Sequence, residues 1–306
     1  MVTRRDFLAA SVAAHVAAPF ASNLRAQPAQ AAGMLLAMHQ NTSRAAGFRG
    51  SLEGWSRAGI RYAELNDAML DGFLESDTLV GARSLLDDLG MTPVCGAAVM
   101  QDLWLPGPAH QDALETWRRR CEQFAGLGLE LIYCPSITNR RVTAEEFSGT
   151  PTSVREAGEI ARAHGLTAMI EFTRTSTHIA TLTTALRMIR EANHANVRPM
   201  LDFFHFFSGL SKTEDLDLLQ PGELAHTHFQ DVADGLREAI DNNSRLIPGD
   251  GIAPVVPTLR TLAEKGYSGV LSVELFRAEY VSGDPYVVAS EIRRKCEAVM
   301  SAAGVA

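Results

Sequence analysis

The sequence predicts a single (β/α)8 barrel, an α/β fold in which eight parallel strands alternate with helices. Eight short apolar runs of strand length, each followed by a helical stretch or a helical turn, extend over roughly 250 or more residues. Several helical stretches also end in a glycine just before the next apolar run. A doubly wound open sheet is the alternative, but no glycine-rich phosphate loop follows the first strand, and eight units exceed the usual number for such a sheet.

The predicted strands are short and rich in apolar residues. In chain order they lie near residues 34–38, 60–65, 92–97, 129–133, 166–171, 198–202, 224–228 and 269–274. Amphipathic helical stretches lie between them, at residues 76–89, 109–127, 153–164, 179–192, 253–265 and 285–302. Gly90, Gly128, Gly165 and Gly266 follow four of these stretches, where a left-handed residue is expected to end the helix.

Residues 1–31 resemble a twin-arginine export signal. The hexapeptide TRRDFL at residues 3–8 leads into an alanine-rich apolar run, and AQA at residues 29–31 fits a small-x-small cleavage site. The run is too short to span a membrane, and an ordinary amphipathic helix is the alternative. We therefore expect Tat-dependent export to the periplasm and a barrel domain at residues 32–306.

The net charge of the chain is negative. It is −8 for the whole sequence, and removal of residues 1–31 takes away three arginines and one aspartate, which leaves −10. Nucleic acid is disfavoured as a partner because phosphate binding needs a basic face. We expect a small-molecule carbohydrate substrate and no membrane span, and the oligomeric state stays open, with a homo-oligomer among the alternatives.

None of the four cysteines lies in a C-x-x-C pair, which argues against a zinc knuckle and a thioredoxin-type motif. Cys95 and Cys134 fall at the ends of neighbouring predicted strands, so a disulfide between them is one interpretation. Buried free thiols are the favoured interpretation.

Four consecutive predicted strands end in metal-binding side chains, which are Glu171, Asp202, His228 and Glu274. In a barrel of this kind the carboxyl ends of the strands meet on one face, and that face carries the chemistry. Three carboxylates and one imidazole suit one divalent ion. Oxygen-rich ligation favours Mn²⁺ or Mg²⁺, with Co²⁺ or Zn²⁺ as alternatives.

At these positions the sequence resembles the sugar phosphate isomerase/epimerase superfamily, the xylose isomerase-like TIM barrels. The similarity covers most of residues 34–302 and is carried by five pieces: IEF at 170–172, LDFFH at 201–205, HTHFQD at 226–231, RLIPGDG at 245–251 and SVEL at 272–275. As an ordered set they are specific for the superfamily, and they say little about the substrate.

The resemblance implies roles for particular residues. Glu171, Asp202, His228 and Glu274 would bind the ion, and His205 and Arg245 would contact the substrate. In the ketose 3-epimerases of this superfamily the two ligating glutamates also act as acid and base. Those epimerases carry a further acidic residue where this chain has threonine at position 177, so the sugar stays undefined. The chain also lacks the additional ligands of the endonuclease IV members.

The leading function is a metal-dependent isomerase or epimerase of a small sugar or hydroxy-carbonyl compound that works through a metal-stabilised enediolate. A metal that bridges a carbonyl and a neighbouring hydroxyl stabilises the enediolate charge, while carboxylates move the proton. If the β-hydroxyl leaves instead, the result is a lyase or dehydratase acting on a keto-sugar, an inosose or a 3-keto-glycoside. A non-catalytic sugar-binding protein is the third alternative.

Three further residues are expected around the pocket because of where they fall in the chain. Glu64 and His39 end the second and first predicted strands and would line the pocket mouth. Trp104 follows the third strand, where an indole would stack on the apolar face of a sugar or anchor a lid. Glu64 and Trp104 are therefore candidate substrate-binding residues.

Three other polar residues have more than one interpretation. His226 points to the same side as His228 by strand alternation, and support of the metal ligands or core packing is favoured over substrate contact. Asp231 would either orient His228 or cap the following turn. His178 lies near a helix start and is expected on the solvent side.

Overall fold

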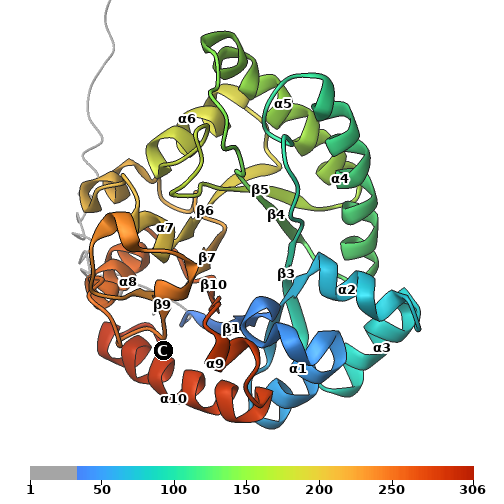
Figure 1. Ribbon diagram of the computed structural model, residues 1–306, viewed down its shortest axis with the longest axis vertical. Coiled ribbons are helices and arrows are strands. Elements are labelled where there is room, and N and C mark those ends of the chain that lie inside the picture. The colour runs from blue at the N-terminus through green and yellow to red at the C-terminus, as the bar shows by residue number, and fades with distance from the viewer. Residues whose placement is uncertain (1–32) are drawn as a thin grey trace, which may run out of the picture. The chain divides into compact units, whose positions relative to one another are not determined.

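The computed structural model describes residues 33–306 and places them in a closed barrel of eight parallel strands. Around the ring the order is β1, β2, β3, β4, β5, β6, β7 and β10, and β10 pairs with β1. Figure 1 shows the helices as an outer ring around these strands. The predicted (β/α)8 fold is confirmed. The export signal expected at residues 1–31 lies outside the described residues.

Each barrel strand coincides with a predicted apolar run, with boundaries that differ by no more than two residues. The strands are β1 Leu35–His39, β2 Tyr62–Asn66, β3 Thr92–Ala97, β4 Leu131–Pro135, β5 Thr167–Glu171, β6 Val197–Asp202, β7 His226–His228 and β10 Val270–Val273. Two short strands that were not predicted, β8 Asp231–Val232 and β9 Arg245–Leu246, pair antiparallel outside the barrel sheet. Two residues are too few to show an alternating pattern.

Ten α-helices lie within residues 33–306. They are α1 Gly47–Arg57, α2 Asp67–Leu74, α3 Leu79–Asp88, α4 Pro108–Gly126, α5 Ala144–Ala163, α6 Leu182–Ala192, α7 Phe203–Ser208, α8 Val255–Glu264, α9 Ala278–Val281 and α10 Pro285–Ala303. Short 3-10 helices occupy Gln40–Ala46, Thr213–Leu218, Arg237–Ala239 and Asn242–Ser244. Six α-helices were predicted, and α1, α2, α7 and α9 were not.

Helix α1 was not predicted because it contains three glycines, which lower helix propensity. Packing compensates for this, since Phe48, Leu52 and Trp55 of α1 are all buried. Helix α5 begins nine residues before the predicted start. A capping box sets this beginning: the Glu146 amide donates to Thr143 Oγ1 at 3.2 Å, and the Thr143 amide donates to Glu146 Oε2 at 2.8 Å.

Glycines end four of the helices, as predicted. Gly90, Gly128, Gly165 and Gly266 all have positive φ values, between 61° and 82°. Such a residue lets the chain leave the helix and turn directly into the next strand. Asn193 takes the same left-handed conformation after α6, with φ at 48°.

The main hydrophobic core fills the space between the strands and the helices, with Trp55, Trp117 and Phe124 among its largest buried side chains. A smaller cluster that includes Tyr133, Met169 and Met200 fills the barrel interior. All four cysteines are buried and free, in agreement with the favoured interpretation, so Cys95 and Cys134 do not pair.

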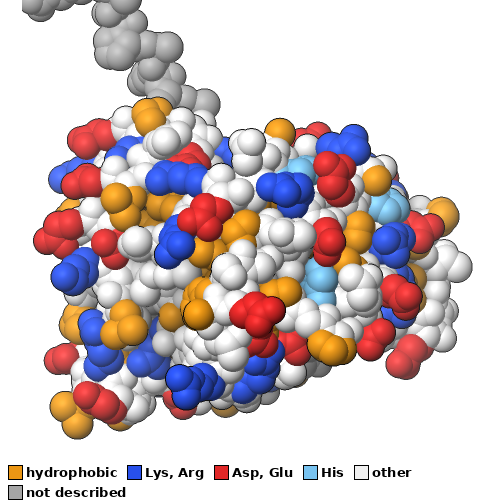
Figure 2. All heavy atoms as spheres, turned by 90° about the horizontal axis from the view of Figure 1, so that it is seen from above, with side chains coloured by type: hydrophobic (Ala, Val, Ile, Leu, Met, Phe, Trp, Pro, Cys, Tyr) orange, Lys and Arg blue, Asp and Glu red, His pale blue; other side chains and the backbone are white. Residues whose placement is uncertain are grey.

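No helix within residues 33–306 combines the length and the apolar character that crossing a membrane requires. Figure 2 shows one face of the protein, on which acidic and basic side chains are interspersed. The negative net charge is therefore not gathered into one patch on that face.

Candidate functional site

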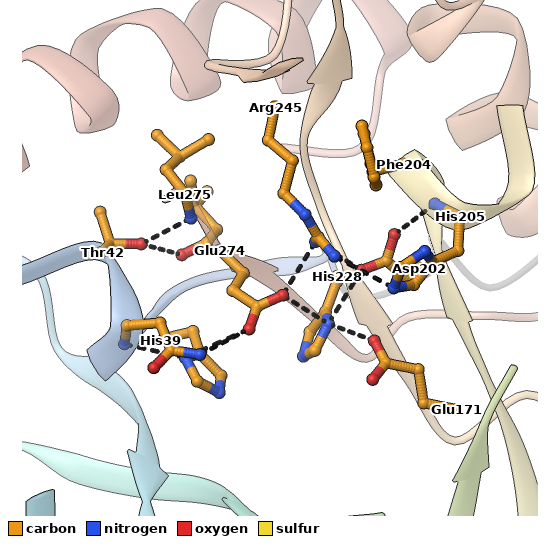
Figure 3. Close-up of polar contacts among 12 residues, drawn as sticks. His39, Thr42, Glu171, Asp202, Phe204, His205, His228, Arg245, Glu274 and Leu275 are labelled. Atoms are coloured by element: carbon orange, nitrogen blue, oxygen red, sulfur yellow. Dashed lines mark hydrogen bonds and ion pairs between the residues drawn. The ribbon is translucent and has the colours of Figure 1, made fainter. Parts of the chain in front are cut away.

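The four predicted strand-end ligands come together around one nitrogen atom. His228 Nδ1 lies 3.0 Å from Glu171 Oε1, 3.2 Å from Asp202 Oδ2 and 3.4 Å from Glu274 Oε2. One ligand atom from each of the four residues lies within 4.8 Å of every other. Figure 3 shows the three carboxylates pointing toward His228. We call these four residues the strand-end cluster.

The barrel itself positions this cluster. Glu171, Asp202 and His228 are the last residues of β5, β6 and β7, and Glu274 directly follows β10. Asp202 also begins α7, because its Oδ1 accepts a hydrogen bond from the backbone amide of His205 at 2.7 Å. One Asp202 oxygen is thereby committed to the helix, which leaves Oδ2 for the cluster.

The chemistry of the cluster fits a divalent cation. Glu171 Oε1 is buried and has no hydrogen-bond donor, although it lies close to His228 Nδ1. Burial raises the pKa of Glu171 to about 8, because the charged form loses its hydration. A bound cation would balance the negative charge of the carboxylates and would be coordinated by Glu171 Oε1, which has no hydrogen-bond partner. These four residues could therefore hold a metal.

Glu64 does not line the pocket, in contrast to the sequence prediction. It is fully buried beneath the cluster, where its Oε1 accepts from His228 Nε2 at 3.0 Å and its Oε2 accepts from His226 Nε2 at 2.9 Å. The prediction placed Glu64 at the end of its strand, but β2 continues to Asn66. Its side chain therefore lies inside the barrel, one layer below the mouth.

This arrangement fixes the orientation of His228. A ring that donates through Nε2 to Glu64 presents its Nδ1 to the carboxylates of the cluster. Burial alone would raise the pKa of Glu64, but the neighbouring His228, His226 and His39 outweigh burial and hold that pKa well below its usual value. His226 supports the cluster through Glu64, which is the interpretation that the sequence favoured.

Arg245 from β9 reaches over the cluster. Its Nη1 donates to Asp202 Oδ2 at 2.7 Å and to Glu274 Oε2 at 2.8 Å, and its Nη2 lies 3.1 Å from His205 Nε2. Phe204 stacks on the guanidinium at 4.6 Å from the ring centroid. Arg245 is only 2% exposed, so this cation balances part of the buried negative charge.

Asp231 holds the loop that follows Arg245. Its carboxylate accepts from the amides of Val232, Gly249 and Ala253 at 2.8, 3.0 and 2.9 Å. Of the two roles left open for Asp231, the structure shows the turn cap. The loop is thereby tied to β8, the strand that pairs with β9.

A pocket with a volume of about 580 Å³ opens above the cluster. Glu171, Glu274, His205 and Arg245 line it, whereas Asp202 and His228 are completely buried behind them. Further lining comes from loops around the mouth, including Val99, Ile137, Asn139, Thr175, Ile240 and Asn242.

Trp104 is not among the residues that line the pocket, so the structure gives it no stacking surface for a sugar. It is 2% exposed, its Nε1 donates to the Cys134 carbonyl at 3.0 Å, and it packs edge-on against Trp117 of α4. The loop after β3 turns its indole into the space between barrel and helix. Trp104 thus anchors that loop in the core.

Two histidines also differ from their predicted surroundings. His39 is fully buried rather than at the pocket mouth, with its Nδ1 3.7 Å from Glu274 Oε1. His178 is 4% exposed rather than on the solvent side, and its Nε2 is bonded to Thr150 Oγ1 at 2.8 Å. In both cases a neighbouring element covers the ring, which a local sequence pattern does not reveal.

Two further pocket residues contact the cluster and were not predicted from the sequence. Asn41 donates from Nδ2 to Glu274 Oε1 at 2.9 Å, and the Tyr133 ring lies edge-on to His228 with centroids 5.1 Å apart. Burial, followed by the charges of Glu274 and Glu171, raises the pKa of Tyr133 well above its usual value. Its place near the end of a predicted strand was the signal that could have identified it.

Part of the sequence is similar to curated proteins named inosose isomerase. The inosose isomerase of Bacillus licheniformis is 28% identical over 174 residues, which are 56% of this chain and 63% of that protein. The inosose isomerase of Halalkalibacterium halodurans is 30% identical over 152 residues, 49% of this chain and 54% of the relative. The aligned region thus spans less than two thirds of these curated relatives.

Solved structures share the fold at lower identity. The crystal structure of the IolI protein with a bound zinc atom has a TM-score of 0.81 and 22% identity, and the match covers 88% of this chain and 98% of that one. A structure of L-ribulose 3-epimerase has a TM-score of 0.72 at 16% identity, over 89% and 96% of the two chains. The sequence profile of one family matches residues 54–296, most of the described chain. The protein therefore belongs to the xylose isomerase-like TIM barrel family.

Proposed function

We propose that the protein is a divalent-metal-dependent isomerase or epimerase of a small polyhydroxylated carbonyl compound, with an inosose as the first candidate substrate. The observation that carries the proposal is that the four residues of the strand-end cluster differ in their access to the pocket. Only Glu171 and Glu274 face the pocket, while Asp202 and His228 are enclosed behind them. The relatives named inosose isomerase support the choice of substrate.

The strand-end cluster would hold the ion through its three carboxylates and His228 Nδ1. When bound, the ion supplies Lewis-acid stabilisation of the negative charge that develops next to the reacting carbon. Mn²⁺ and Mg²⁺ suit the oxygen-rich ligands, while the zinc of the IolI structure makes Zn²⁺ an alternative, alongside Co²⁺.

Proton transfer is the task that we assign to the two glutamates. Glu171 Oε2 makes no hydrogen bond within residues 33–306, so it is free to hold a proton and deliver it, whereas the hydrogen bonds from Asn41 and Arg245 to both oxygens of Glu274 stabilise its ionised form. Burial raises the pKa of Glu171, and at Glu274 the charges of Arg245 and His228 outweigh burial and lower the pKa. Two carboxylates with pKa values moved apart are suited to act as base and acid.

The product depends on how the glutamates share the proton. If Glu274 removes it from one face of the carbon and Glu171 supplies one to the other face, the centre inverts and the reaction is an epimerisation. If one glutamate performs both steps on adjacent carbons, the reaction is an isomerisation. Arg245 and His205, at the pocket wall, would bind a substrate oxygen and keep the carbon between the two carboxylates.

A solvent-exchange experiment tests the proposal. An inosose is incubated in D₂O with the metal-loaded protein, and deuterium in the product is followed by NMR. We expect deuterium at the reacting carbon, and Glu171→Gln or Glu274→Gln should slow exchange by about 10²–10⁴-fold. Glu279→Gln, at an exposed glutamate of α9 that does not line the pocket, serves as the matched control. Turnover without deuterium would exclude the two-glutamate epimerisation, in which the second glutamate supplies a solvent-derived proton, and sugar binding without turnover would indicate a binding protein.

A lyase or dehydratase acting on a keto-sugar, an inosose or a 3-keto-glycoside is the second candidate, and the size of the pocket favours it. About 580 Å³ lies within the range of sites for drug-sized ligands. The outer lining includes the apolar side chains of Val99, Ile137 and Ile240, which would suit an aglycone. Release of p-nitrophenol from p-nitrophenyl 3-keto-glucoside would favour the lyase, and a stable glycosidic bond would argue against it.

A further inference from the structure

Tyr133 of β4 lies at the inner wall of the pocket. Its side chain is 2% exposed and lines the pocket together with Glu171 and Glu274. The ring packs edge-on against His228, which fixes the hydroxyl close to the strand-end cluster. Nothing in the proposed proton transfer uses this hydroxyl.

The hydrogen bonds of His39 determine where the Tyr133 hydrogen can go. The backbone amide of Asn41 donates to His39 Nδ1 at 3.0 Å, so Nδ1 carries a lone pair and no hydrogen. A neutral imidazole with an accepting Nδ1 carries its hydrogen on Nε2. His39 Nε2 lies 3.1 Å from the Tyr133 hydroxyl oxygen, and it must therefore be the donor in that bond.

The hydroxyl hydrogen of Tyr133 is thus left without an acceptor. Because His39 donates, the phenol oxygen accepts, and the structure shows no other hydrogen bond of the Tyr133 hydroxyl within residues 33–306. The side chain borders the pocket, where a ligand atom could take that hydrogen. Buried hydroxyl groups almost always find a partner, so an acceptor is expected there.

We infer that Tyr133 is a substrate-binding residue whose hydroxyl donates a hydrogen bond to an oxygen atom of the bound substrate. The inference rests on the proposed function, which makes that substrate a polyhydroxylated carbonyl compound. Glu274 as a carboxylate can only accept hydrogen bonds, so Tyr133 adds a neutral donor to the charged one of Arg245. The pocket thereby selects compounds with an oxygen at this wall.

Removal of one hydroxyl group tests the inference. Tyr133→Phe keeps the ring against His228 and removes only the donor. Tyr267→Phe is the matched control, because the Tyr267 hydroxyl is also buried but donates to the Val270 carbonyl at the opposite end of β10. With an inosose as substrate, Tyr133→Phe should lower kcat/KM by about 10- to 100-fold, since a buried substrate oxygen loses its partner. Tyr267→Phe should leave kcat/KM within about twofold of wild type.

A fluorine NMR measurement observes the contact without turnover. The chain has five tyrosines, so 3-fluorotyrosine labelling of the magnesium-loaded protein gives a small spectrum, in which Tyr133→Phe identifies the signal of Tyr133. Saturating inosose should shift this signal and leave that of Tyr267 in place. An unshifted Tyr133 signal, or unchanged kcat/KM in Tyr133→Phe, would overturn the inference while an active wild type preserves the proposed function.

The proposed function can also fail while the role of Tyr133 is still tested. If the wild type does not turn over inososes, the proposed function fails for that substrate, and the Tyr133 signal is then measured with D-allulose and with methyl 3-keto-glucoside. A shift with either compound supports the role of Tyr133. No shift with any of the three compounds overturns it.

Discussion

His226 and His228 lie two residues apart on β7, and one carboxylate binds both. Glu64 accepts from both rings inside the barrel, at 2.9 and 3.0 Å, and none of these three side chains is exposed. Glu64 does not line the pocket, but its hydrogen bond to His228 Nε2 determines that Nδ1 is the nitrogen that faces the other residues of the strand-end cluster. The proposed metal ligand His228 thus depends for its orientation on a buried carboxylate outside the strand-end cluster.

Replacing Glu64 should therefore weaken metal binding. Glu64→Gln keeps the volume but loses the charge that holds both histidines, and we expect the affinity for Mn²⁺ to fall about 10- to 100-fold. Titration calorimetry with Mn²⁺ measures this. Glu115→Gln, at an exposed position of α4, is the control. Equal affinities in Glu64→Gln and wild type would show that His228 is oriented without Glu64.

His178 gives the folded protein a pH dependence away from the cluster. Burial lowers the pKa of His178 to about 4, from 6.5 for the exposed side chain. Between these values the unfolded chain binds more protons than the folded protein, so the free energy of unfolding falls as the pH falls. The loss from this group between pH 7 and pH 5 should be about 2 kcal/mol.

Denaturant unfolding at the two pH values checks this expectation. His178→Phe removes the group that titrates, so the loss of unfolding free energy between pH 7 and pH 5 should be about 2 kcal/mol smaller than in wild type. The variant should be less stable at both pH values, because it lacks the hydrogen bond to Thr150. An identical loss in wild type and variant would mean that His178 is protonated equally in both states.

At the scale of the elements, the β8–β9 pair positions Arg245, and its loop is tightly packed. A Cβ atom at Gly251 would lie 2.3 Å from the Val232 carbonyl oxygen and 2.5 Å from Asp231 Oδ1. Asp231 holds the same loop through three backbone amides. The loop and the strand that carries Arg245 therefore have little freedom to shift independently.

Gly251→Ala should displace this loop and, with it, the guanidinium of Arg245. We expect the variant to lose about 1–3 kcal/mol of unfolding free energy and to show a raised KM. Gly235→Ala is the matched control, because a Cβ there has nothing within 4 Å. Thermal unfolding measures the stability of the two variants, and steady-state kinetics measure their KM values. Equal stability and equal KM in Gly251→Ala and Gly235→Ala would mean that the loop adjusts without moving Arg245.

The strands and helices also show which parts of the structure could be predicted from the sequence. All eight barrel strands followed from short apolar runs. The convergence of the strand-end cluster followed from the four runs that end in ligand-type residues, because barrel topology brings strand ends together. The places of Glu64 and Trp104 did not follow. Whether a side chain near a strand end faces the pocket, the barrel interior or the helices depends on register and on loop path, which a local pattern does not contain.

At the scale of the whole molecule, residues 33–306 form one barrel with the strand-end cluster at the carboxyl ends of its strands. We propose that residues 1–31 direct this domain through the twin-arginine route, which carries folded proteins. Changing Arg4 and Arg5 to lysine should then retain the protein in the cytoplasm, as measured by cell fractionation. Unchanged export of that variant would refute this route.

The most direct test of the account is the metal content of the purified protein. Asp202→Asn keeps an oxygen for the cap of α7 but removes one ligand charge, and Asp88→Asn, at an exposed position of α3, is the control. By mass spectrometry of the elements, we predict about one equivalent of Mn, Mg, Co or Zn per chain in wild type and control, and a large loss in Asp202→Asn. A wild type without metal that takes none up on titration would contradict the central claim that the strand-end cluster is a metal site.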